Sequence, residues 1–119
     1  MKRIGWAALA AVALVTISAP ALSAQADKAI LGTWRGPYAE NCQAVRNVTT
    51  EDFMIITPRK VEGYEGSCVI TKLSKTKIGY SLQKLCEGEG ETFREAMTIK
   101  VINPNRLLVN GNKVYERCN

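Results

Sequence analysis

The chain contains no histidine, no Cys-x-x-Cys pair and no glycine-rich phosphate-binding motif. Without histidine it cannot build a Ser-His-Asp triad, a Cys-His pair or an imidazole metal site. Aromatic residues make up only 7% of the sequence, and they are expected in the core rather than on a stacking platform. The sequence also lacks a continuous run of lysine and arginine of the kind that marks nucleic-acid binding. We therefore expect neither an enzyme nor a nucleic-acid-binding protein, and no cofactor.

Residues 1–26 have the pattern of a secretory signal peptide. Lys2 and Arg3 precede an apolar stretch without charge, and residues 24–26 offer the small-x-small site that signal peptidase requires. The apolar stretch is shorter than the roughly 20 residues that span a bilayer, so a membrane anchor is less favoured. We expect a bacterial exported protein, periplasmic or secreted, with one domain over residues 27–119 and no membrane span in its mature form.

All four cysteines lie in the expected mature domain, where an even count predicts disulfides. We favour Cys42–Cys68 with Cys86–Cys118, because each pair would tie a loop or a terminus to a central hairpin. The alternative is Cys68–Cys86 with Cys42–Cys118, since a turn near Lys77 would place Cys68 opposite Cys86. Zinc is less favoured, because four thiolates without histidine or Cys-x-x-Cys spacing match no usual zinc site.

Short runs of β-branched and apolar residues alternate with turn residues along the domain. Strands are predicted over residues 29–35, 53–57, 60–64, 67–73, 78–86, 93–102, 106–109 and 113–118. Residues 36–50 form a polar loop, Asn110-Gly111 predicts a tight hairpin, and no helix is expected. The spacing predicts an all-β fold, a disulfide-stapled antiparallel meander barrel of about seven to eight short strands. A barrel is preferred over a sandwich because closure removes exposed strand edges.

The Gly-x-Trp motif that ends at Trp34 resembles the opening of lipocalin-like (calycin) barrels. In that group the tryptophan closes one barrel end and an arginine of the last strand packs across it. The resemblance implies these roles for Trp34 and Arg117, with Arg106 as the less favoured arginine. Three other motifs resemble those of small bacterial exported proteins of unassigned function, namely residues 63–68, 86–91 and 115–118.

Two binding functions remain. The favoured one is an inhibitor-like monomer that acts through surface loops on an exported or envelope protein. Its contacts would come from the polar loop and the central hairpin tip: Arg35, Tyr38, Glu40, Arg46, Lys75 and Lys77. The alternative is a small-ligand carrier of lipocalin-like type. It ranks second because we expect side chains to fill the interior of so small a barrel.

Charge gives two weaker indications. Loss of Lys2 and Arg3 with the signal would leave 14 basic and 11 acidic residues, a net charge of +3, which would steer a strongly basic partner away. Glu87, Glu89 and Glu91 share one face if the segment is extended, so they are a weak candidate for a Ca²⁺ site. A solvated turn is the more typical role of such a segment, and no metal is expected.

Overall fold

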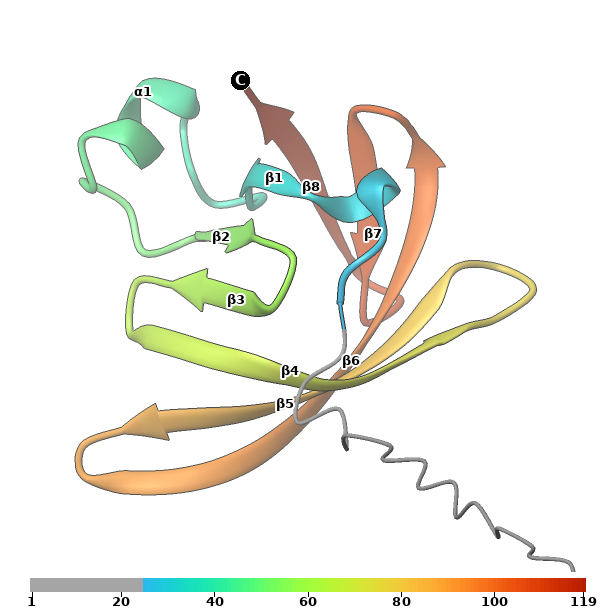
Figure 1. Cartoon of the computed structure of the whole chain (residues 1–119). Coiled ribbons are helices and arrows are strands. Elements are labelled where there is room, and N and C mark those ends of the chain that lie inside the picture. Colours follow the sequence, from blue (N-terminus) through green and yellow to red (C-terminus); the bar gives the residue numbers. More distant parts are fainter. Residues whose placement is uncertain (1–24) are drawn as a thin grey trace, which may run out of the picture.

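Eight strands close into one antiparallel barrel in a computed structural model of the chain, which describes residues 25–119 (Figure 1). The strands are β1 Gly32–Arg35, β2 Phe53–Ile56, β3 Lys60–Gly63, β4 Gly66–Lys75, β5 Tyr80–Gly88, β6 Glu91–Asn103, β7 Arg106–Val109 and β8 Lys113–Cys118. Each strand pairs with the next in sequence, and β8 returns to pair with β1. The predicted meander barrel is therefore confirmed, and the bounds of β7 and β8 match the predicted runs.

Two short helices depart from the expectation of none. The 3₁₀ helix η1 (Lys28–Ile30) replaces the start of the first predicted strand. The helix α1 (Cys42–Arg46) lies in the segment predicted as an irregular loop. It begins at Asn41, whose side-chain oxygen accepts a hydrogen bond from the Ala44 N–H at 2.8 Å. This N-cap stabilises a single turn too short to leave a periodic sequence signal.

The disulfide pairs are Cys42–Cys118 and Cys68–Cys86, so the favoured pairing was wrong and the alternative is confirmed. Cys68 and Cys86 are direct partners in the β4–β5 ladder, with Cα atoms 4.0 Å apart. Cys118 ends β8 on the outer face of the barrel, where it packs in a small cluster with Ala39 and Val45 beneath α1. The helix brings Cys42 to this cluster, so the loop is tied to the C-terminus and not to the hairpin.

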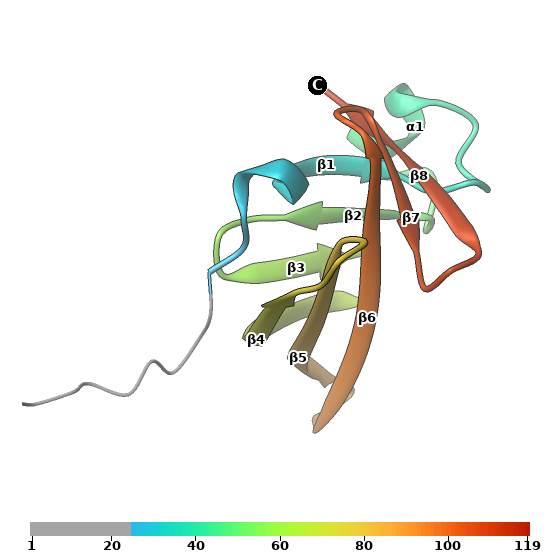
Figure 2. The same cartoon turned by 90° about the vertical axis from the view of Figure 1, so that its right-hand side faces the viewer.

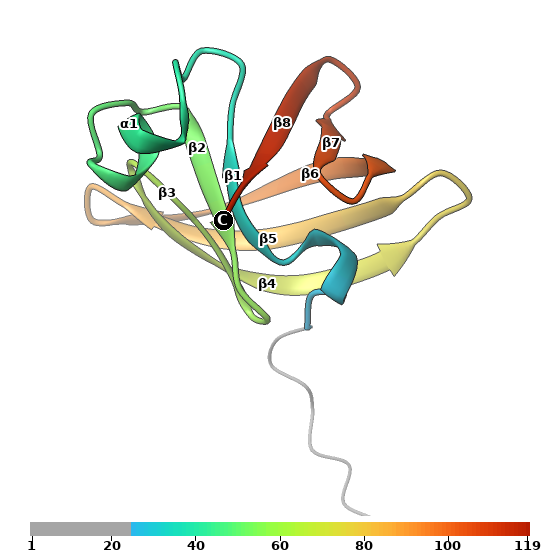
Figure 3. The same ribbon diagram turned by 90° about the horizontal axis from the view of Figure 1, so that it is seen from above.

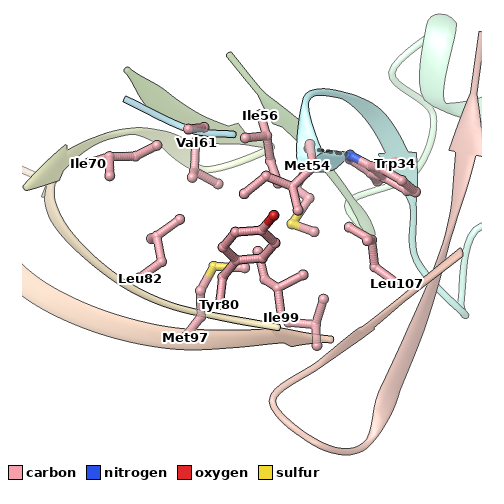
Figure 4. Packing of buried hydrophobic residues seen from close by; sticks show 13 residues of the cluster. Trp34, Met54, Ile56, Val61, Ile70, Tyr80, Leu82, Met97, Ile99 and Leu107 are labelled. Atoms are coloured by element: carbon pink, nitrogen blue, oxygen red, sulfur yellow. Dashed lines mark hydrogen bonds between the residues drawn. The ribbon is translucent and has the colours of Figure 1, made fainter. Parts of the chain in front are cut away.

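One end of the barrel is filled by a continuous apolar core. Its fully buried side chains come from η1 and six strands: Ile30, Trp34, Ile56, Ile70, Leu82, Ile99 and Leu107. Figure 4 shows these side chains, together with Tyr80 and Met97, pointing toward one another across the interior. Burial of this apolar surface is the main favourable term that stabilises the fold.

The filled end is closed by η1, Trp34 and Arg117. The Trp34 indole donates to the Ile30 carbonyl at 3.0 Å, and the Arg117 guanidinium lies 4.2 Å from the Trp34 ring. Arg117 also donates to the carbonyls of Leu31, at 2.6 Å, and of Pro104, at 2.9 Å. The contact implied by the lipocalin-like resemblance is therefore present. Arg106 does not share it, because its guanidinium pairs with Glu116 on the surface.

Strand directions define two ends of the molecule. The β4–β5 turn lies at the closed end beside η1, whereas the β3–β4, β5–β6 and β7–β8 turns lie at the other end. Figure 2 shows η1 and α1 beyond opposite ends of β1, and Figure 3 shows the β4–β5 and β5–β6 hairpins extending in opposite directions. Anything that binds inside the barrel has to enter at the end away from η1.

The expected signal peptide falls on residues 1–26, of which residues 1–24 lie outside the described part, so it stays a prediction. Ala26 is described: it packs into the core and donates its N–H to the Pro58 carbonyl at 2.6 Å. Within residues 25–119, no helix has the length and apolar character needed to cross a membrane.

Candidate functional site

A cavity of about 800 Å³ opens at the end of the barrel opposite η1. We call it the mouth. The β3–β4, β5–β6 and β7–β8 turns surround it, and Met54, Met97 and Val109 of the core form part of its lining. The expectation that side chains fill the whole interior was therefore wrong at this end. Ligand pockets in proteins typically measure about 300–1,000 Å³, so the mouth has room for a small organic molecule.

Ladder register explains why this end stays hollow. Side chains of directly paired residues project to the same side of a sheet, and successive residues alternate. Gly63 is paired with the buried Met54, so it occupies an inward-facing position and places no side chain there. Gly66 and Gly88 continue the same inward rows on β4 and β5. Three glycines thus leave room that larger side chains would occupy.

The wall of the mouth combines apolar side chains with polar groups and carries one ion pair. Cys68, Cys86 and Phe93 are successive partners across β4, β5 and β6 and follow the same inward rows. Two residues further toward the core on each strand, Lys84 is paired with Glu95, and its Nζ lies 3.6 Å from the Glu95 carboxylate. The Lys84 side chain is only 14% exposed, whereas that of Glu95 is 51% exposed. The pair therefore marks the boundary between the filled core and the mouth.

Acidic residues dominate the charge around the mouth. Six glutamates belong to its lining: Glu62, Glu65, Glu87, Glu89, Glu91 and Glu95. Glu62 and Glu87 alternate with inward-facing residues, so their side chains project outward, whereas Glu91 and Glu95 follow the inward rows and Glu65 and Glu89 lie in the turns at the opening. Such a concentration in a cavity with low-dielectric walls makes the local potential negative, although the chain as a whole carries +5.

The predicted contact residues do not form one surface. Lys75 and Lys77 are exposed on the β4–β5 hairpin at the closed end, whereas Tyr38 and Glu40 are exposed on the loop that leads to α1 (Figure 1). Arg46 is exposed on α1 itself and donates to the Gln43 side chain at 3.1 Å.

Arg35 has a structural role at the base of the α1 loop. Its guanidinium pairs with the Glu116 carboxylate and donates to the Ala39 carbonyl at 3.1 Å. The loop is further fixed by Tyr38, whose N–H donates to the Asp52 carboxylate at 2.5 Å. Tyr38 remains 80% exposed, with the Lys113 ammonium 5.9 Å from its ring. Of the predicted contacts, Tyr38 is thus held on an ordered loop with its ring toward solvent.

The three glutamates proposed for Ca²⁺ do not share one face. A two-residue turn at Glu89 and Gly90, both with positive φ, separates β5 from β6. Glu91 pairs with Gly88 and Glu87 pairs with Thr92, so Glu87 and Glu91 project to opposite sides of the ribbon. The extended segment assumed from the sequence is folded back on itself, and the premise of the cation site was wrong.

Within residues 25–119, three potential metal ligands converge at Cys68, Cys86 and Glu95. The two sulfur atoms are bonded to each other, so they offer no thiolate to a metal. In the wall of the mouth, Cys68 and Cys86 thus form a disulfide and Glu95 pairs with Lys84.

Three ionisable groups of the described part of the chain have shifted pKa values. The Tyr80 hydroxyl donates to the Asp27 carboxylate at 2.8 Å, which lowers the pKa of Asp27 below 3.8 and raises that of Tyr80 above 10.0. Burial, with the nearby Asp52 charge, raises the pKa of Tyr115. Tyr115 lines the mouth, so it presents a neutral phenol there at physiological pH.

Comparison with protein-family models, curated proteins and solved structures finds no match for this chain. The eight-stranded antiparallel barrel is compatible with a calycin-like architecture. What the structure adds to the sequence is the mouth and its wall. The sequence alone does not single out Lys84, and only the ladder register shows that it faces inward beside Leu82 and Cys86.

Proposed function

We propose that this protein is a small exported binding protein that holds a ligand in the mouth of its barrel. The cavity of about 800 Å³ carries the proposal, since its lining joins inward-facing residues of several strands to a filled core. The carrier function, ranked second from the sequence, therefore takes precedence. The absence of histidine and the two closed disulfides favour binding over catalysis.

Export to the periplasm or beyond is part of the same proposal. Two disulfides fit an oxidising compartment, and the sequence of residues 1–26 fits a secretory signal. A lipocalin-like relationship is supported by the meander topology and by the stacking of Arg117 on Trp34 at the closed end. Closure at one end and access at the other suit a protein that carries its ligand inside.

The test is binding of the neutral apolar dye N-phenyl-1-naphthylamine, whose fluorescence rises in an apolar site. The variant Gly63→Phe should abolish saturable binding, because it adds a ring at an inward-facing position of the mouth. A Cβ at Gly63 would lie 3.6 Å from its nearest neighbour, the Phe53 carbonyl, so the first added atom makes an ordinary van der Waals contact. Gly88→Leu is a second filling variant, since its Cβ would lie 3.6 Å from the Phe93 ring.

The matched control is Val114→Phe, which adds a similar ring at a 39%-exposed position of β8 that does not line the mouth. It should leave dye binding unchanged. Thermal unfolding of each variant shows whether it is folded. Dye binding that survives in both folded filling variants, or that is absent from the wild-type protein, would refute the proposal.

Binding of a protein partner through the α1 loop is a second candidate, because Tyr38 stays 80% exposed on a loop fixed by a disulfide. Tyr38→Ala separates the two functions. It should leave dye binding and unfolding unchanged if the ligand site is the mouth, since Tyr38 is not part of the cavity lining.

A further inference from the structure

We infer that the ligand of the mouth is an amphipathic cation, a molecule with an apolar body and an amine, ammonium or guanidinium group. The inference rests on the proposed ligand-binding function and names the chemical class of the ligand. It depends on the combination of apolar side chains deep in an open cavity with acidic groups nearer its opening, since neither feature alone would specify a cation with an apolar body.

The acidic groups at the opening come from neighbouring segments and lie at different depths. Glu65 lies in the β3–β4 turn and Glu89 in the β5–β6 turn, which belong to adjacent hairpins of the barrel. Glu91 follows the inward rows because it is paired with Gly88, and Glu95 lies deeper on the same strand. A cation at the opening would thus have carboxylates around it, and a positive charge lowers the repulsion among them.

Lys84 does not cancel this negative charge. It is the single basic residue among the described residues that line the mouth, and its Nζ is 3.6 Å from the Glu95 carboxylate. The two charges largely neutralise each other as seen from the opening. Glu65, Glu89 and Glu91 then remain at the mouth, and no other basic residue of the described lining opposes them.

The apolar part of the ligand has its own place. Val61, Met97 and Val109 belong both to the lining and to the buried core, and Phe93 is 44% exposed above them. An apolar body would cover these groups and remove their surface from water, which is favourable in proportion to the area buried. Its charged end would stay near the carboxylates. A polycation without an apolar body would gain only the second of these contributions.

The experiment measures displacement of N-phenyl-1-naphthylamine by three decyl compounds that share one chain and differ in charge. Decyltrimethylammonium should displace the dye at least about tenfold more strongly than decanol, because each exposed carboxylate near a cation strengthens its binding by roughly 1.4- to 5-fold and several carboxylates lie at the mouth. Decanoate should be the weakest of the three. The advantage of the cation should shrink in high salt, where the screening length falls to about 3 Å at 1 M.

Two double variants with the same change in net charge locate the effect. Glu65→Gln with Glu91→Gln removes two carboxylates from the mouth, whereas Glu40→Gln with Glu51→Gln removes two exposed ones that do not line it. The first pair should reduce the preference for the cation about threefold or more, and the second by less than about 1.5-fold. The control pair should leave the affinity for the neutral dye unchanged, and displacement by each decyl compound is compared after correction for each variant's own dye affinity.

The outcomes separate this inference from the proposed function. Dye binding with equal displacement by the three decyl compounds would overturn the cation assignment and leave the ligand site standing. Equal effects of the two double variants would also overturn it, because the charge effect would then be non-local. If spermine displaced the dye as well as decyltrimethylammonium does, the apolar body would be unnecessary and the class would be a simple polycation or a basic peptide segment instead.

Discussion

The two disulfides should contribute unequally to stability, because they close chain loops of very different length. Cys42–Cys118 spans 76 residues of sequence, whereas Cys68–Cys86 spans 18. In the chain-entropy model, removing the long bridge costs about 4.5 kcal/mol and removing the short one about 3 kcal/mol at 25 °C. We therefore expect Cys42→Ala/Cys118→Ala to lose more unfolding free energy than Cys68→Ala/Cys86→Ala, by roughly 1–1.5 kcal/mol.

Alanine is the suitable replacement, since Cys86 and Cys118 are 3% and 7% exposed and a serine hydroxyl there would be buried. The assay is urea unfolding of both double variants under non-reducing conditions, with the denaturant slope compared as well as the midpoint. The slope should rise more for the Cys42/Cys118 variant, because its unfolded chain loses the larger constraint and exposes more surface.

Thiol titration of the native variants tests the pairing itself. Each double variant should show no free thiol, because its two remaining cysteines are bridged to each other. With the pairing Cys42–Cys68 and Cys86–Cys118, each variant would break both bridges and expose two thiols. That result, or a larger loss of stability from the short bridge than from the long one, would refute the reasoning.

Two further predictions concern the closed end. Arg117→Met should lower the free energy of unfolding by about 2–4 kcal/mol, because it removes a stacked guanidinium and its hydrogen bonds to the Leu31 and Pro104 carbonyls. The control Arg106→Met should lower it by less than about 1 kcal/mol, because it removes only a surface ion pair. Urea unfolding followed by Trp34 fluorescence measures both. Tyr80→Phe should lower stability near neutral pH. The wild-type hydrogen bond needs an ionised Asp27 and a neutral Tyr80. The stability difference between wild type and variant should therefore shrink as pH falls through the Asp27 pKa, below 3.8, and as pH rises through the Tyr80 pKa, above 10.0. Thermal unfolding across pH measures this difference, and a difference independent of pH would contradict the prediction.

Local pattern was enough to predict the strands, because alternation and turn residues act within a few residues of one another. The Asn110-Gly111 turn is one example: both residues have positive φ in the β7–β8 hairpin, as the sequence pattern requires. The disulfides were harder. Cys68 and Cys86 meet because the β4–β5 ladder places them in register, whereas Cys42 and Cys118 meet across 76 residues through a helix of five residues. No local pattern specifies that second contact.

The mouth could not be predicted for a similar reason. Gly63, Gly66 and Gly88 are typical turn residues in the sequence, and only the closed barrel puts all three on its inner face at one end. The position of the glutamates could not be predicted for the same reason. Glu65, Glu89, Glu91 and Glu95 are separated in the sequence of a chain of net positive charge, and strand pairing brings them to one opening. Net charge therefore does not describe the local charge at the mouth.

The Lys84–Glu95 pair gives a physical reason for the barrel to keep its mouth open. Collapse of the β5–β6 ribbon onto the core would close the cavity, but it would also bury both charges away from water. Removing an ion pair from water costs several kcal/mol per ion and is repaid only with good geometry and further hydrogen bonds. At a separation of 3.6 Å, Lys84 is already largely buried, with 14% of its side chain exposed, whereas Glu95 at the edge of the hollow stays 51% exposed and hydrated. The same two residues that limit the core thus preserve the space in which we place the ligand.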